Sequence, residues 1–130
     1  MYEDYQEHFP YHHHNLYKEN EYPPDLAWCD KVFDSAATKA WATRLSGRSC
    51  IGPTVFSASW YLPGDHSLPH TDAIASGGGA DRQVAFIWHL VKDWRSEWGG
   101  AFFWCPKALY MPPIFNTLVL FNVGRTRATS

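Results

Sequence analysis

Residues 57–72 read SASWYLPGDHSLPHTD, and this stretch decides the fold and the chemistry that we expect of the chain. A strand-like run ends at Tyr61, Pro63-Gly64 marks a turn, and His70-Thr71-Asp72 lies on the next expected strand. Residues i and i+2 of a strand project from the same face, so an imidazole and a carboxylate at these positions can hold one metal ion. A His-x-Asp tripeptide alone also fits a surface turn, so the surrounding sequence has to decide between the two interpretations.

The sequence around this stretch is typical of short strands. Runs rich in Val, Phe, Trp and Ile alternate with Gly and Pro clusters, and they predict strands at about residues 54–61, 68–73, 82–91, 101–104 and 117–123. The aromatic content, with 7 Trp, 7 Tyr and 8 Phe, also favours strands. We therefore expect a mainly β fold with an N-terminal helix, arranged as a β-sandwich or jelly-roll barrel.

The first 46 residues divide into a lead-in and a helix. Residues 1–24 are polar and aromatic and end in Tyr22-Pro23-Pro24, which predicts an extended arm. Apolar residues then recur at spacings of three and four, which predicts one amphipathic helix over residues 25–46. Asp25 fits as its N-cap and Gly47 as its C-terminal stop.

Length and composition exclude several classes of protein. With 130 residues, 45% of them hydrophobic, the chain suits one domain and is too short for two, so we take residues 1–130 as a single domain. The net charge is -2 and the basic residues are scattered, which argues against a nucleic-acid partner. Without a membrane-length apolar run or a secretion signal, we expect a cytoplasmic protein that does not contact a membrane. Three widely spaced cysteines, Cys29, Cys50 and Cys105, argue against a disulfide framework or a zinc knuckle.

Residues 57–72 resemble the iron-binding segment of the Fe(II)/2-oxoglutarate oxygenases, specifically that of the prolyl-hydroxylase-like group. In that family a tyrosine ends one strand, a Pro-Gly turn follows, and a His-x-Asp lies on the next strand. Three more segments resemble family segments in the same order, namely RQVAFIWHL at 82–90, WGGAFF at 98–103 and FNTLVLFNV at 115–123. The resemblance covers about residues 54–123 and implies a double-stranded β-helix, the jelly roll of this family.

The resemblance also implies roles for four residues. His70 and Asp72 correspond to two of the three protein ligands of iron. Tyr61 matches a tyrosine whose hydroxyl bonds to the cosubstrate, and His89 falls where relatives often place a cosubstrate-contacting tyrosine. The alternatives are a core tyrosine and an exposed strand histidine. The implied cofactors are Fe(II) and 2-oxoglutarate, with ascorbate as a candidate reductant, and Asp72 favours hydroxylation because halogenating relatives carry a small residue there.

The family pattern continues with a distal histidine ligand and then an Arg or Lys that anchors the far carboxylate of 2-oxoglutarate. Residues 124–130 read GRTRATS, so we expect this chain to lack both groups and the last strands of the jelly roll. We do not favour the available substitutes, namely Arg125 or Arg127 as the anchor and His66 or the run His12-His13-His14 as the third ligand. A histidine run in a polar arm is typically solvated. An unpaired sheet edge would favour a second copy or a completing partner chain.

Two functions stay open on the sequence. The first is an Fe(II)/2-oxoglutarate-dependent dioxygenase that hydroxylates a prolyl or similar residue of a protein, or a small amino-acid-like molecule. The second is a truncated, non-catalytic module of the same fold that acts in protein interaction. A cupin-like metal protein shares the jelly roll but would carry a His-x-His with further ligands, which the strand segments lack.

Overall fold

The computed structural model describes residues 2–6, 9–17, 21–70, 72 and 82–123, and it is rich in short strands. The strands are β1 (Tyr2–Gln6), β2 (Phe9–Tyr17), β3 (Ser57–Trp60), β4 (His66–Ser67), β5 (Val84–His89), β6 (Phe102–Trp104), β7 (Leu109–Met111) and β8 (Thr117–Asn122). The helices are α1 (Pro24–Phe33) and α2 (Ala36–Ser46), with the 3-10 turns η2 (Ser96–Trp98) and η3 (Cys105–Lys107). No helix in the described part of the chain is long and apolar enough to cross a membrane.

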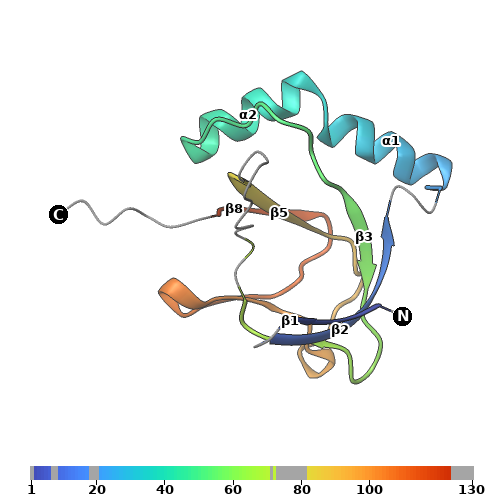
Figure 1. Ribbon diagram of the computed structural model, residues 1–130. Helices are drawn as coiled ribbons and strands as arrows, with labels where there is room; N and C mark the ends of the chain where they lie inside the picture. Colours follow the sequence, from blue (N-terminus) through green and yellow to red (C-terminus); the bar gives the residue numbers. More distant parts are fainter. Residues whose placement is uncertain (1, 7–8, 18–20, 71, 73–81, 124–130) are drawn as a thin grey trace. The chain divides into compact units, whose positions relative to one another are not determined.

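The strands form three small sheets. β1, β2 and β3 lie side by side in that order, with β4 also paired to β2, while β5 pairs with β8 and β6 with β7 (Figure 1). The pairings β1–β2, β2–β3, β2–β4 and β6–β7 are antiparallel. Over the described residues these sheets do not close into a barrel, so the structure shows a β-rich fold with two helices.

The chain divides into two compact units. The first comprises Met1–Tyr22, Ser57–His70 and Trp88–Leu118, and the second comprises Pro23–Phe56, Thr71–Ile87 and Val119–Ser130. The first contains the sheet built on β2 together with β6 and β7, and the second contains both helices. Strands β5 and β8 contribute residues to both units.

The N-terminal residues form paired strands where the polar pattern predicts an extended lead-in arm. β1 pairs with β2 in the register Tyr2↔His13, and β2 pairs on with β3 in the register His14↔Trp60. The paired residues of β2 and β3 are forty or more positions apart in the sequence. Whether a segment forms a strand depends strongly on such a partner, and a local sequence pattern does not show it. The N-terminal segment is therefore an integral strand of the first unit.

The helix predicted over residues 25–46 is two helices, broken at Asp34–Ser35. Ser35 adopts an extended backbone and its hydroxyl accepts the Thr38 N–H at 3.2 Å, which makes it the N-cap of α2. Asp25 lies in the first turn of α1 rather than at its cap, since the helix begins at Pro24 without a side-chain cap. The predicted stop at Gly47 is confirmed, with a left-handed φ of 69°.

Four of the five predicted strands are confirmed in shorter form as β3, β5, β6 and β8. The strand predicted over 68–73 is wrong for residues 68–70 and 72, which lie outside any strand, and residues 71 and 73 fall outside the described residues. Pairing is confined to His66–Ser67, and Pro69 has no N–H to donate to a neighbouring strand. His70 and Asp72 therefore do not share one face of a strand.

A stack of three phenylalanine rings packs within the second unit. The Phe33 ring, at the end of α1, lies with its centroid 4.5 Å from that of Phe86 on β5 and 5.5 Å from that of Phe56. The rings are nearly parallel, with interplanar angles of 7° and 17°. The stack joins helix and strand through the apolar area that it buries.

Replacing Phe33 should destabilise this unit. We expect Phe33→Ala to lower the free energy of unfolding by about 2–3 kcal/mol, less than for a fully buried ring because Phe33 is half-buried. Urea unfolding monitored by far-UV circular dichroism measures this change. The matched control is Trp28→Ala on the same helix, where the side chain is 65% exposed. Equal losses in the two variants would contradict the stacked arrangement.

Candidate functional site

Strand β2 supports the segment that carries Tyr61 and leads to His70. It pairs with β3 up to the register His14↔Trp60 and with β4 from the register His12↔His66. Only His13 lies between these two points on β2, whereas residues 61–65 lie between them on the other side. The partner strand therefore bulges out in a five-residue loop opposite one residue of β2.

The loop is closed by a tight turn over residues 62–65. The Asp65 N–H donates to the Leu62 carbonyl at 2.9 Å, and the Leu62 N–H donates to Asp65 Oδ2 at 2.7 Å. Pro63 and Gly64 occupy the central positions, and Gly64 has a φ of 94° that favours glycine. The Pro-Gly turn predicted from the sequence is confirmed.

Tyr61 lies at the start of this loop and is half-exposed. Its ring stacks on the buried His13 ring, with centroids 5.2 Å apart and an interplanar angle of 20°. Partial burial and the nearby Asp65 carboxylate both disfavour a phenolate, so they raise the pKa of Tyr61 above its usual value of 10.0. Tyr61 therefore offers a hydroxyl donor at neutral pH.

His70 is exposed and its ring is oriented by a backbone carbonyl. His70 Nδ1 lies 2.7 Å from the Leu68 carbonyl oxygen, with the Ser67 hydroxyl at 3.4 Å. A carbonyl oxygen only accepts hydrogen bonds, so this contact places the ring hydrogen on Nδ1 and the lone pair of the neutral ring on Nε2. Histidines that bind metals generally have this arrangement, so His70 fits a metal ligand.

Asp72 is oriented by an arginine of the same unit. Arg82 Nη1 donates to the Asp72 carbonyl oxygen at 3.3 Å and lies 3.9 Å from Asp72 Oδ1. The Asp72 carboxylate thus lies beside a guanidinium, and carboxylate oxygens are among the donors that bind non-haem iron. His70 belongs to the first unit and Asp72 to the second, so each side chain is oriented by contacts within its own unit.

His89, at the end of β5, is partly buried, and its Nε2 has no hydrogen-bond partner among the described residues. Burial lowers the pKa of His89 below its usual value of 6.5, because it disfavours the charged ring. The alternative of an exposed strand histidine is therefore wrong, and His89 is neutral at pH 7. A buried nitrogen without a partner is a suitable contact for a polar ligand.

The alternative third ligands do not assemble into a site. Within the described ranges, no group of three or more His, Cys, Asp or Glu side chains is placed to hold a metal ion. His13 is buried against Tyr61, and His66 directs Nδ1 to the Gly64 carbonyl at 3.2 Å. The histidine run is thus not simply solvated, which corrects that expectation for His13. Arg125 and Arg127 lie outside the described residues.

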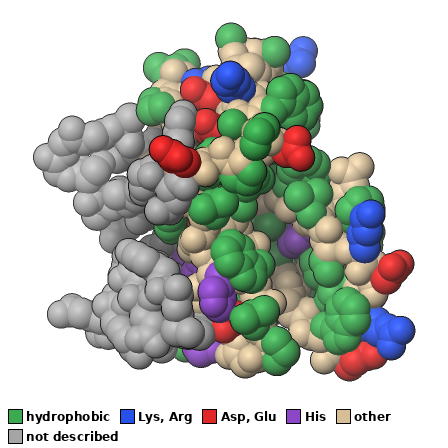
Figure 2. Space-filling view, turned by 90° about the vertical axis from the view of Figure 1, so that its right-hand side faces the viewer, with side chains coloured by type: hydrophobic (Ala, Val, Ile, Leu, Met, Phe, Trp, Pro, Cys, Tyr) green, Lys and Arg blue, Asp and Glu red, His purple; other side chains and the backbone are tan. Residues whose placement is uncertain are grey.

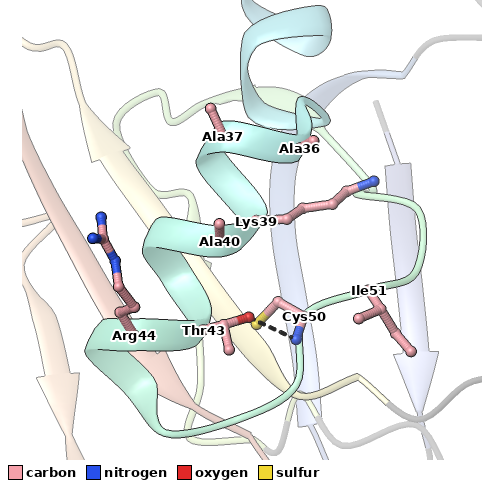
Figure 3. A pocket seen from close by; sticks show the side chains of 8 residues that line it. All are labelled: Ala36, Ala37, Lys39, Ala40, Thr43, Arg44, Cys50 and Ile51. Atoms are coloured by element: carbon pink, nitrogen blue, oxygen red, sulfur yellow. Dashed lines mark hydrogen bonds between the residues drawn. The ribbon is translucent and has the colours of Figure 1, made fainter.

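A hollow on the second unit has a different character. It lies along α2 and is lined by three alanines, by Thr43, Lys39 and Arg44, and by Cys50 and Ile51 (Figure 3). The Cys50 N–H donates to the Thr43 hydroxyl at 3.0 Å, which holds the returning chain against the helix. Because its lining has neither a carboxylate nor an imidazole, this hollow is unsuited to iron.

Comparison with known families bears on the region that carries all four candidate residues. The sequence pattern of the 2OG-Fe(II) oxygenase superfamily matches residues 56–130, more than half of the chain. The chain belongs to this superfamily. Oxygenases of the superfamily generally use Fe(II) and 2-oxoglutarate. No curated protein and no solved structure matches this oxygenase-family chain.

The partly buried His89 predicts a specific pH dependence of stability. Its pKa is lower in the folded chain than the value of about 6.5 expected after unfolding. The unfolded chain therefore binds more protons below pH about 6.5, so His89 lowers the free energy of unfolding as the pH falls through this range. We expect His89→Phe to lose less stability than the wild type between pH 7.5 and 5.5, as measured by urea unfolding. Parallel stability curves for the two proteins would contradict this.

Proposed function

We propose that this chain provides the iron- and 2-oxoglutarate-binding segment of a hydroxylating dioxygenase of the prolyl-hydroxylase-like group, on a jelly roll to which β3 and β5–β8 contribute. The supporting observation is the orientation of His70, whose Nδ1 faces the Leu68 carbonyl so that Nε2 carries the lone pair. The family match covers His70 and also Asp72, two residues further on. The jelly roll and the prolyl-hydroxylase-like group follow from the resemblance of residues 54–123.

In this proposal His70 Nε2 and the Asp72 carboxylate hold Fe(II), a mixed nitrogen and oxygen donor set that suits non-haem iron. Arg82 contacts both the Asp72 backbone carbonyl and its carboxylate, and so restricts where this carboxylate lies. When bound, Fe(II) and 2-oxoglutarate supply the oxidation, in which O2 gives one oxygen atom to succinate and the other to a C–H bond of the substrate, with loss of CO2. The protein residues orient and enclose the reacting molecules.

Tyr61 and His89 contact the cosubstrate in this proposal. Tyr61 is protonated at neutral pH, and its raised pKa extends this to more alkaline solutions, so its hydroxyl can donate a hydrogen bond to a carboxylate of 2-oxoglutarate. His89 stays neutral and offers its buried Nε2. Because both side chains are uncharged, they can orient the anionic cosubstrate by hydrogen bonds and leave its negative charge available to iron.

The proposed substrate is a prolyl or similar residue of a protein, or a small amino-acid-like molecule. This class follows from the resemblance, and Asp72 supports hydroxylation as the reaction. Ascorbate is the proposed reductant. We also propose that a second copy or a completing chain pairs with an open sheet edge, since none of the sheets formed by the described residues closes.

An anaerobic titration tests the proposed site. Fe(II) and then 2-oxoglutarate are added to the purified chain, and the visible charge-transfer absorption of the chelated complex is recorded. We expect the band in the wild type and at least a tenfold loss of metal affinity in His70→Ala, because one strong donor is removed. The matched control is His66→Ala, which removes another exposed histidine of the same segment and should keep the band. A band of equal strength in both variants would contradict the assignment.

A non-catalytic interaction module is the second candidate. Several large side chains of the first unit are about half-exposed, among them Trp98 at 57%, Tyr110 at 57% and Phe103 at 50%. Figure 2 shows hydrophobic side chains spread over the face that it presents. Exposed apolar side chains of this size are typical of protein contacts. A wild-type chain that gives no charge-transfer band would favour this module.

A further inference from the structure

The side chains of β2 that face the loop belong to the histidine run of the N-terminal segment. His13 stacks on Tyr61, and His14 stacks on Trp60 with centroids 5.4 Å apart and an interplanar angle of 20°. These two rings contact the last residue of β3 and the first residue of the loop. Two consecutive residues of β2 therefore hold the point at which the chain leaves β3.

Asp65 connects His14 to the turn. His14 Nδ1 lies 3.3 Å from Asp65 Oδ2, and the same carboxylate oxygen accepts the Leu62 N–H at 2.7 Å. The Asp65 side chain is only 4% exposed and that of His14 is 19% exposed. A carboxylate taken out of water needs polar partners around it, and Asp65 has the Leu62 N–H as a hydrogen-bond donor and the His14 ring as a close polar neighbour within ion-pair distance.

The same contacts determine where Tyr61 lies. Its neighbour Leu62 is fixed by two hydrogen bonds to Asp65, and the Tyr61 ring rests on His13. If Asp65 turned outward, the turn would lose one of these bonds and the Tyr61 hydroxyl would move. A hydrogen bond to a bound ligand tolerates a displacement of only a few tenths of an ångström before it weakens.

We propose that His14 is a positioning residue of the cosubstrate site, which acts through Asp65 on the turn 62–65 and thereby holds the Tyr61 hydroxyl where 2-oxoglutarate binds. This inference rests on the function proposed for Tyr61. It implies that strand β2 contributes to the affinity of the chain for 2-oxoglutarate. Metal affinity, which depends on His70 and Asp72, should not depend on His14.

The test compares two polar substitutions. In His14→Asn the side-chain amide nitrogen lies about where Nδ1 lies, whereas in His14→Gln it is one carbon further from the backbone. We expect His14→Gln to raise the dissociation constant for 2-oxoglutarate about tenfold, equivalent to about 1.4 kcal/mol, and His14→Asn to stay within about threefold of the wild type. Both are measured by titrating 2-oxoglutarate into the anaerobic Fe(II)-loaded chain, and Fe(II) affinity should be unchanged in both.

The control and the outcomes separate the two proposals. Ser59→Ala removes a side-chain contact to Asn15 between the same two strands but away from the turn, and should leave the 2-oxoglutarate affinity unchanged. Equal affinities for the Asn and Gln variants, or an equal loss in Ser59→Ala, would overturn the role of His14 while the proposed function stood. No charge-transfer band in the wild type would overturn the proposed function and this inference with it. Circular dichroism confirms that each variant is folded.

Discussion

The pairing of β2 with both β3 and β4 is the interaction on which the rest of the candidate site depends. β3 and β4 are too short to hold a fixed geometry alone, with four and two residues. Because β2 pairs with the end of β3 and with the start of β4, the five residues between β3 and β4 form a loop with fixed ends. Tyr61 opens that loop, and the chain that leaves β4 reaches His70 three residues later.

The polar groups of the candidate site are arranged by contacts that exist without any ligand. The Leu68 carbonyl sets the tautomer of His70, Arg82 holds Asp72, and the Asp65 carboxylate is stabilised by the Leu62 N–H. Such prior orientation reduces the conformational entropy lost on binding, which raises affinity without any added contact. A family whose chemistry is carried by iron and a cosubstrate leaves mainly this task of orientation to the protein.

Local patterns in the sequence predicted some features and missed those that depend on distant partners. The Pro63-Gly64 turn, the β5 strand and the Gly47 stop are confirmed because each follows from nearby residues with a strong conformational preference. β2 was missed because its partners β3 and β4 lie far along the chain, and β1 was missed with it because β1 pairs with β2. The break at Ser35 was missed because the apolar spacing continues through it, although a serine that can cap a helix was a usable signal. The roles predicted for His70, Asp72, Tyr61 and His89 stay predictions. The contact between His14 and Asp65 could not be found from the sequence because it joins residues 51 positions apart.

Paramagnetic broadening tests the central claim, that the segment from Tyr61 to Asp72 holds the metal, most directly. Mn(II), which resists oxidation, replaces Fe(II), and two-dimensional amide NMR spectra of the ¹⁵N-labelled chain are recorded at increasing metal concentration. The amide signals around His70 and Asp72 should broaden first, the Tyr61 signal should follow, and 2-oxoglutarate should strengthen the effect. Broadening centred on the N-terminal histidine run, or no site-specific broadening at all, would contradict the claim.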